Sequence, residues 1–252
     1  MRSILAFLTI IGLGAPAGMI LCGWCLVTGD IMPCYMVACA IVRVGLWVAG
    51  VRVVVEGLET VPAHTACIFM ANHVSNLDPP VLIPVLPGRT AVFLKRSLMK
   101  IPVLGYAMRL ANFIPVDRAG SVQTAQENVR LARKVIEAGI HITTFVEGTR
   151  SKDGRLLPFK KGPFYLAMEC GVPVVPVTIV GTHELMPKGR FAIKPGTATV
   201  IFHPPIEPEN FGSRERLMEK VRAVIESGLP EELRQRELTT KDMKAHEGNA
   251  NT

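Results

Sequence analysis

The chain has 252 residues, of which 49% are hydrophobic and 19% are charged, against about 25% charged residues in an average soluble domain. This length suits one large α/β domain, and the composition excludes a disordered protein, a coiled coil and a small disulfide scaffold. The net charge of +7 favours anionic partners. Because the sequence contains no basic helix or basic tail, we expect a phospholipid or a membrane surface and no nucleic acid.

The charge deficit lies in the first 50 residues, whose three charged side chains are Arg2, Asp30 and Arg43. Residues 4–27 carry no charge, and as a helix they would extend roughly 36 Å, enough to cross a hydrocarbon core about 30 Å thick. A second apolar run covers about 31–50, after a connector that is too short for anything but a tight reversal. The sequence therefore predicts a membrane-anchoring helical hairpin over residues 1–50.

The way in which this hairpin meets the bilayer is left open, since it can span the membrane or lie in one leaflet. A cleaved signal peptide is the alternative, but the apolar run continues past the small residues 15–17 and another run follows. Gly14 and Gly18 form a small-xxx-small pair that would let the two helices approach closely. If the hairpin spans, its connector, which has no Lys or Arg, lies outside, and the positive-inside bias predicts a catalytic domain on the cytoplasmic side of the cell membrane.

From residue 51 onward, short β-rich runs alternate with helical patterns. The predicted strands are 51–55, 67–71, 91–94, 113–116, 141–145, 174–179 and 197–202. Amphipathic helices are predicted after Ser121 and after Ser213, each of which resembles an N-cap. This alternation predicts an α/β domain over 51–229, with a mixed, largely parallel sheet and flanking helices. We expect residues 230–252 to be a disordered polar tail.

Residues that suit acid–base chemistry follow the second predicted strand. His73 comes directly after this strand, and Asp78 follows five residues later. Histidine transfers protons near neutral pH, and a carboxylate across a turn can fix its tautomer. A structural role is the alternative, because Asp78 is followed by Pro, as in a helix N-cap with its first helical residue.

A second set of polar residues follows the fifth predicted strand. Here Gly148, Thr149 and Arg150 can offer backbone N–H groups, a hydroxyl and a guanidinium, which together suit a phosphate. An ordinary β-turn with solvated charges is the alternative. Arg118 lies at the end of another predicted strand. Cys22 and Cys25 form a CxxC without a second pair, and no metal site is predicted.

Four blocks of this sequence, in this order and spacing, resemble the 1-acyl-sn-glycerol-3-phosphate acyltransferase family of glycerolipid acyltransferases. The blocks are residues 72–78 (Asn-His-x4-Asp), 113–118, 145–151 and 172–177. The resemblance covers roughly residues 50–205. Two departures concern backbone shape: Val146 stands where the family usually has Pro, and Ala111 stands where a Gly often begins the second block.

The resemblance implies an enzyme that transfers a fatty acyl group from an acyl thioester to the sn-2 hydroxyl of 1-acyl-sn-glycerol-3-phosphate. The product would be phosphatidic acid, in phospholipid biosynthesis. An acyltransferase of the same fold that acts on another lysophospholipid or a remodelling acceptor is the alternative. His73 would be the general base and Asp78 would orient it. The residues that would hold the glycerol phosphate are Glu147, Gly148, Thr149 and Arg150, with Arg118 and Lys95.

The implied co-substrate is acyl-CoA or an acyl carrier protein thioester, with no cofactor and no metal. The implied partners are a lysophospholipid, membrane lipids and, for the second kind of donor, acyl carrier protein. A membrane scaffold without activity is disfavoured by the intact His73 and Asp78. A soluble hydrolase is disfavoured by the apolar N-terminus and the lack of a G-x-S-x-G elbow. The other histidines, at 64, 141, 183, 203 and 246, are expected to be structural or solvated.

Overall fold

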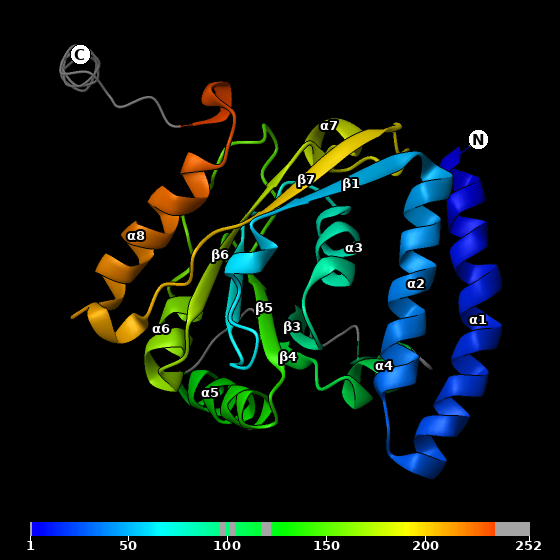
Figure 1. Cartoon of the computed structure of the whole chain (residues 1–252), viewed down its shortest axis with the longest axis horizontal. Helices are drawn as coiled ribbons and strands as arrows, with labels where there is room; N and C mark the ends of the chain where they lie inside the picture. The colour runs from blue at the N-terminus through cyan, green and yellow to red at the C-terminus, as the bar shows by residue number, and fades with distance from the viewer. Residues whose placement is uncertain (1, 96–98, 101–103, 117–121, 235–252) are drawn as a thin grey trace.

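A computed structural model of the chain describes residues 2–95, 99–100, 104–116 and 122–234 (Figure 1). These residues form a seven-stranded sheet in the order β1-β7-β6-β2-β5-β3-β4. Its strands are β1 (Val51–Glu56), β2 (Ile68–Ala71), β3 (Thr90–Lys95), β4 (Ile114–Val116), β5 (His141–Phe145), β6 (Val174–Val180) and β7 (Gly196–Phe202). Neighbouring strands are parallel except β6 and β7, which are antiparallel. The predicted mixed, largely parallel sheet is confirmed. The first and last residues of every strand lie within one position of the predicted bounds.

Helices cover both faces of the sheet. They are α3 (Asp78–Leu82), α4 (Leu104–Leu110), α5 (Val122–Glu137), α6 (Lys161–Cys170), α7 (Thr182–Leu185) and α8 (Arg214–Ser227). Short 3-10 helices occupy Leu58–Thr60, Ile83–Val85, Pro208–Asn210 and Glu231–Leu233. The Ser213 hydroxyl accepts from the Arg216 amide at 3.3 Å and caps α8 as predicted. Ser121, the predicted cap of α5, lies outside the described residues.

The core lies in two layers, one on each side of the sheet. Strand β2 is buried on both faces, and its side chains alternate between the two layers. Phe69 packs in the layer beneath α3 and α2, whereas Ile68 and Met70 pack in the layer beneath α5, α6 and α8. Burial on both faces explains why β2 is continuously apolar in sequence.

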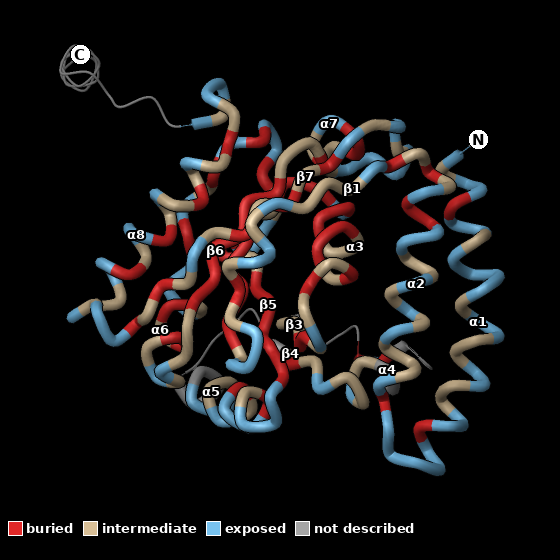
Figure 2. Tube along the Cα trace, in the orientation of Figure 1, coloured by how far each residue is buried: buried red, intermediate tan, exposed pale blue. Residues whose placement is uncertain are grey.

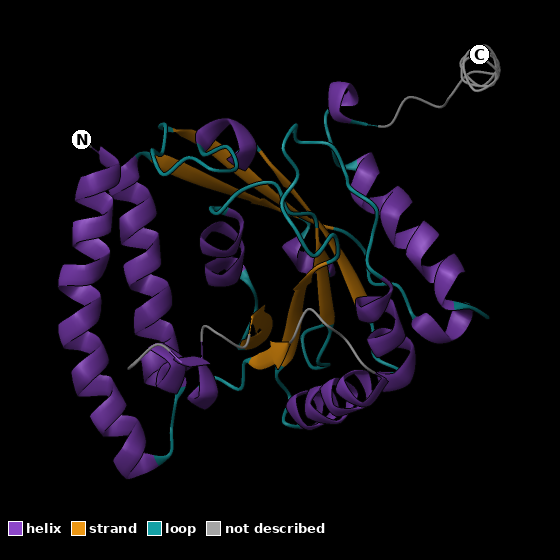
Figure 3. Ribbon diagram, turned by 180° about the vertical axis from the view of Figure 1, so that it is seen from behind, coloured by secondary structure: helices purple, strands orange, loops and turns teal. Residues whose placement is uncertain are grey.

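The N-terminal residues form two long helices, α1 (Arg2–Thr28) and α2 (Met32–Ala49), which run side by side along one edge of the domain (Figures 1 and 3). Both are long and apolar enough to cross a membrane, and most of their surface is exposed (Figure 2). One part of α2 is nevertheless attached to the domain. Leu46 and Ala49 join the core layer beneath α3, and the Arg43 guanidinium donates to the Pro84 carbonyl.

The close approach between α1 and α2 occurs at Gly45. A Cβ atom added to Gly45 would lie 2.6 Å from the Ile10 side chain, so any larger residue here would require Ile10 to shift. A Cβ added to Gly14 or Gly18 would meet nothing within 4 Å. The predicted role of Gly14 and Gly18 in helix packing is therefore wrong. The close contact is instead made by Gly45 of α2, against which the Ile10 side chain of α1 packs.

The ordered chain extends beyond the predicted boundary at residue 229. After α8, the Arg234 guanidinium donates to the carbonyls of Leu229 and Ser227, at 2.8 and 3.0 Å. These contacts hold residues 230–234 against the end of α8. The rest of the predicted tail, 235–252, lies outside the described residues.

Candidate active site

The candidate functional residues that the structure describes gather at one edge of the sheet. His73 follows β2, the Glu147–Arg150 turn follows β5, and Thr182 follows β6. These three strands are neighbours and run parallel, so their carboxyl ends meet at the same edge, where sites in α/β folds commonly form. The order of the strands in the sheet therefore brings together residues that are more than 70 positions apart in sequence.

His73 and Asp78 form a hydrogen-bonded pair. The distance from His73 Nδ1 to Asp78 Oδ2 is 2.7 Å. Because an ionised carboxylate only accepts, Nδ1 carries the proton and Nε2 carries the free lone pair. The imidazole also stacks on Phe145, with ring centroids 4.2 Å apart and planes 24° apart, and its side chain is 18% exposed. The ring orientation is thus fixed on two sides, while part of the imidazole remains exposed.

Asp78 is fully buried and its carboxylate accepts four hydrogen bonds. Besides His73, Oδ2 accepts from the amides of Val74 and Ser75, at 2.7 and 2.8 Å. Oδ1 accepts from the Thr182 hydroxyl at 2.5 Å. Asp78 is the first residue of α3, after the N-cap Leu77. Its interpretation as a capping residue is therefore wrong, since the carboxylate points back to the loop that carries His73.

Glu147 is also buried, and it supports the His73 loop from the other side. Its Oε1 accepts from the His73 amide at 2.7 Å, and its Oε2 accepts from the Leu157 amide at 2.8 Å. Burial raises the pKa of Glu147 to about 7. The Ser151 amide donates to the His73 carbonyl at 2.8 Å, so both backbone groups of His73 are bound by the β5 loop. The implied contact of Glu147 with a phosphate is contradicted, because both oxygens are enclosed and bonded to amides.

The exposed part of the β5 loop consists of Gly148, Thr149 and the half-buried Arg150. Gly148 adopts φ of 65°, a conformation that glycine adopts without strain. The Arg150 Nη1 donates to the Asn76 side chain at 2.6 Å, which places the guanidinium over the His73 loop. The structure therefore brings Arg150 together with the His73–Asp78 pair.

Lys95 and Arg118, the two other predicted phosphate contacts, are not fully described by the structure. Lys95 is the last residue of β3, which places its backbone at the same edge of the sheet, and its side chain lies outside the described part of the structure. Arg118 lies outside the described residues.

The segment after β6 contacts both loops, a role that the sequence motifs do not predict. Thr182 contacts Asp78, the Met186 carbonyl accepts from the Ser75 hydroxyl at 2.6 Å, and the Lys188 ammonium donates to the Arg150 carbonyl at 2.6 Å. The one available signal was position: a polar Thr two residues after a buried apolar strand, at the edge where the other motif residues were expected.

Asn72, the first residue of the Asn-His-x4-Asp block, holds the end of β2 against β6. Its amide group donates to the Ile179 carbonyl at 3.0 Å and accepts from the Ile179 amide at 2.7 Å. This buried pair of bonds extends the β2–β6 pairing beyond the last ladder residue. Asn72 therefore fixes where the His73 loop begins.

Two of the remaining histidines have structural partners, as expected. His141 Nδ1 accepts from the Cys67 amide at 3.1 Å, and burial lowers the pKa of His141 below its ordinary value. His203 Nε2 lies 2.8 Å from the Thr178 hydroxyl, which itself donates to the Ile225 carbonyl. The ring nitrogen must then be the donor to Thr178, so His203 is a fixed part of the core between β6, β7 and α8.

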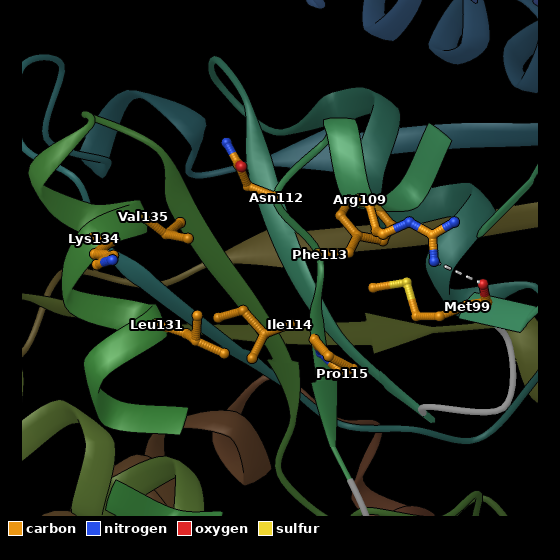
Figure 4. Close-up of a pocket in the computed structure, with 9 residues that line it drawn as sticks. All are labelled: Met99, Arg109, Asn112, Phe113, Ile114, Pro115, Leu131, Lys134 and Val135. Carbon is orange, nitrogen blue, oxygen red and sulfur yellow. Dashed lines mark hydrogen bonds between the residues drawn. The ribbon is translucent and has the colours of Figure 1, made fainter. Parts of the chain in front are cut away.

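A pocket of about 390 Å³ lies elsewhere, between α4, β4 and α5 (Figure 4). Its lining residues are Met99, Arg109, Asn112, Phe113, Ile114, Pro115, Leu131, Lys134 and Val135. None comes from the loops after β2, β5 or β6. Arg109 Nη1 donates to the Met99 carbonyl at 3.1 Å. The pocket is thus separate from the His73 site.

The arrangement at the sheet edge suits one kind of chemistry. An oriented, unprotonated Nε2 can take a proton from a hydroxyl, and a buried carboxylate stabilises the imidazolium that forms. The Arg150 guanidinium, which is bound to Asn76 of the same loop, can bind an anionic group of the same ligand. The geometry therefore fits a ligand that carries both a hydroxyl and a phosphate or carboxylate.

Comparison with known proteins agrees with this chemistry. The model of the acyltransferase family matches residues 52–180, just over half of the chain. The crystal structure of the 1-acyl-sn-glycerophosphate (LPA) acyltransferase PlsC from Thermotoga maritima is similar, with a TM-score of 0.74 and 31% identity. This similarity covers 90% of the present chain and 96% of the PlsC chain.

Curated relatives carry the same kind of name. A 1-acyl-sn-glycerol-3-phosphate acyltransferase of Limnanthes douglasii is 34% identical over 66% of this chain and 58% of its own length. One of Borreliella burgdorferi is 29% identical over 73% of this chain and 78% of its own. The chain spans between 44% and 61% of the length of the first five curated relatives. On the family match and the likeness to the PlsC structure, the chain belongs to the acyltransferase family.

Proposed function

We propose that this protein transfers a fatty acyl group from an acyl thioester to the sn-2 hydroxyl of 1-acyl-sn-glycerol-3-phosphate, forming phosphatidic acid. The observation that carries the proposal is the His73–Asp78 pair, 2.7 Å apart, in a loop to which the Arg150 guanidinium is bound through Asn76. The names of the relatives supply the substrate class, and the site has the two groups that such a substrate needs: a base for its hydroxyl and a cation for its phosphate.

In this mechanism, His73 Nε2 takes the proton of the sn-2 hydroxyl while the hydroxyl oxygen attacks the thioester carbonyl carbon. A carbon–oxygen bond forms, and the tetrahedral intermediate then collapses with cleavage of the carbon–sulfur bond. The imidazolium returns its proton to the departing thiolate. Asp78 stays ionised and stabilises the imidazolium, so the substrate hydroxyl takes the place that serine has in a catalytic triad.

Arg150 binds the substrate phosphate through two guanidinium N–H groups. Lys95 and Arg118 add positive charge, and the exposed backbone of Gly148 and Thr149 adds donors. Glu147 acts indirectly, by holding the His73 backbone. The acyl donor is acyl-CoA or an acyl carrier protein thioester.

We also propose that the catalytic domain lies on the cytoplasmic side of the cell membrane, anchored by α1 and α2. Because Leu46 and Ala49 of α2 are buried against the domain, that end of α2 is not free to be surrounded by lipid. The exposed apolar surface of α1 and of the remaining faces of α2 suits one leaflet of the bilayer. A hairpin that lies in one leaflet satisfies both observations better than one that spans.

The test is an assay of the full-length protein, purified in detergent and reconstituted in vesicles, with lysophosphatidic acid and each kind of donor. Phosphatidic acid should form with at least one donor, and His73→Ala should abolish it. Lysophosphatidylcholine, lysophosphatidylethanolamine and lysophosphatidylglycerol are assayed in parallel. Faster acylation of one of these lipids would overturn the assignment of the acceptor. Absence of acyl transfer to every acceptor would overturn the reaction itself.

A further inference from the structure

The loop of residues 186–195, between α7 and β7, carries the most exposed aromatic side chain described in the domain. Beyond α1 and α2, the exposed large apolar side chains among the described residues are Leu58, at 38%, and Phe191, at 87%. An isolated exposed leucine needs no explanation, but a phenylalanine with almost its whole surface in water is costly unless something covers it.

The charge of this part of the chain is of one sign. Lys188, Arg190 and Lys194 lie in the loop, and the sequence has no Asp or Glu between Glu184 and Glu207. Arg190 and Lys194 are exposed on either side of Phe191. An exposed aromatic ring with cations on both sides is the pattern of a segment that rests at the headgroup level of an anionic bilayer.

The loop is fixed to the end of the apolar hairpin. The Ser3 hydroxyl of α1 accepts from the Ile193 amide at 2.8 Å and lies 3.3 Å from the Ile193 carbonyl. A Cβ atom added to Gly50, just after α2, would lie 2.9 Å from Pro195. Figure 1 shows the chain at the start of β7 near the N-terminal end of α1. The first turns of α1, which bind the loop through Ser3, also expose the apolar side chains of Ile4 and Phe7, at 66% and 63%.

The other end of the same loop is part of the active site. The Met186 carbonyl accepts from the Ser75 hydroxyl in the β2 loop. The Lys188 ammonium donates to the Arg150 carbonyl in the β5 loop. The 186–195 loop therefore reaches from the membrane-facing helices to the residues beside His73.

We propose that the 186–195 loop docks on the membrane, with Phe191 inserted at the headgroup boundary and Arg190 and Lys194 on anionic lipid phosphates. This inference rests on the proposed membrane association of α1 and α2, and goes beyond it by adding a contact from the catalytic domain. An anionic bilayer is the occupant that the observations favour, because the loop is cationic, exposes an aromatic ring and is hydrogen-bonded to the first turn of an apolar helix already assigned to lipid.

The experiment uses the full chain and tryptophan fluorescence. Phe191→Trp is made in a chain whose two natural tryptophans, Trp24 and Trp47, are replaced by Phe; both are exposed, at 53% and 78%. Vesicles contain phosphatidylglycerol and phosphatidylcholine, the latter with or without bromine on its acyl chains. We expect a blue shift and bromine quenching at position 191. The matched control, Lys220→Trp on the exposed side of α8, should remain unquenched.

Charge is tested by the double substitution Arg190→Gln and Lys194→Gln. Each cation near an anionic surface contributes about fivefold in partitioning, so this change should weaken docking of the Phe191→Trp loop by up to about 25-fold. The matched double variant on α8, Arg216→Gln and Lys220→Gln, should leave it unchanged.

The outcomes separate the two proposals. If Trp24 and Trp47 are quenched in the unmodified chain but the indole of Phe191→Trp is not, the loop does not dock, while the anchoring by α1 and α2 stands. If none of the three indoles is quenched, membrane association itself is wrong. Quenching of Phe191→Trp that is equal in vesicles of pure phosphatidylcholine would overturn the role of the anionic lipid.

Discussion

The loop after β2 and the loop after β5 are built from similar polar residues but are used differently. In the β2 loop, Asp78 is fully buried and His73 is oriented by a carboxylate and an aromatic ring. In the β5 loop, Glu147 and Ser151 are buried, whereas Gly148 and Thr149 between them are exposed. The buried members of both loops hold each other, and the exposed members face solvent.

This difference separates positioning from binding. A residue that is buried and has all its hydrogen bonds made can set the orientation of a neighbour, but it cannot reach a ligand. In the sequence, the Glu147 carboxylate of the β5 motif resembles a ligand-binding group. In the structure it is buried and holds the backbone of the His73 loop.

Removal of the base should have the largest effect. His73→Ala leaves no group to accept the hydroxyl proton, so turnover should fall by ~10²–10⁴ or more. The loop backbone remains held by Glu147 and Ser151, so the variant should fold. Steady-state kinetics and circular dichroism of the purified variant check both points. Near-normal turnover in a folded His73→Ala protein would contradict the base role.

Asp78→Asn should have a similar effect on turnover without a comparable loss of structure. The amide oxygen can take the place of Oδ2 and accept from His73, Val74 and Ser75, while the amide nitrogen donates to the Thr182 hydroxyl. The charge that stabilises the imidazolium is lost, so we expect turnover to fall by ~10²–10⁴. A thermal unfolding midpoint near that of the unmodified protein, with turnover also unchanged, would remove Asp78 from the mechanism.

Arg150→Ala should mainly raise KM for the lysolipid. A charge-assisted hydrogen bond is worth roughly 1.5–3 kcal/mol, about 10–150-fold in binding. The phosphate carries a similar charge before and during reaction, so the contact supports substrate and transition state nearly alike. The matched control is Arg155→Ala, an exposed arginine with its side chain beside Glu231 and Arg234. A rise in donor KM with unchanged lysolipid KM would assign Arg150 to the donor.

Thr182→Val should reduce turnover about five- to tenfold, because one of four hydrogen bonds to Asp78 is lost and that oxygen stays buried. A carboxylate that has lost a donor attracts the His73 proton more strongly, so the acidic limb of the pH–rate profile should move to higher pH. Thr182→Ser keeps the hydroxyl and should restore both values. A valine variant that is less stable but has an unmoved pH profile would show a purely structural role.

Glu147→Gln should change stability and leave the lysolipid KM unchanged. The folded state, with its pKa near 7, keeps a proton that the unfolded chain releases near pH 4.5. The free energy of unfolding therefore falls as pH rises through this range, and Gln removes that contribution. Gln also fails to accept one of the two amide bonds, which costs about 1–3 kcal/mol.

The measurement for Glu147 is the thermal midpoint at pH 5 and pH 8, with the exposed Glu219→Gln as the matched control. The difference between the two midpoints should change in Glu147→Gln and stay the same in the control. A lysolipid KM that rises as far as in Arg150→Ala would restore Glu147 as a phosphate contact and contradict the separation of positioning from binding.

Local patterns were sufficient for much of the molecule. The seven strands, α5, α8 and the two apolar helices follow from hydrophobic periodicity, from run length and from capping residues, all of which depend on near neighbours in sequence. The His73–Asp78 pair could also be predicted, because five residues across a turn can meet without help from the rest of the fold.

The tertiary structure decided what local patterns do not specify. Thr182 reaches Asp78 across 104 positions, and Glu147 reaches His73 across 74, because β6 and β5 lie on either side of β2. The strand order also determined that Glu147 turns inward while Arg150 stays accessible. The contact of Lys188 with the Arg150 carbonyl and the exposure of Phe191 were also decided by the tertiary structure. Sequence alone determined which groups are present, whereas burial determined which of them can meet a ligand, since burial depends on every element that packs around the site.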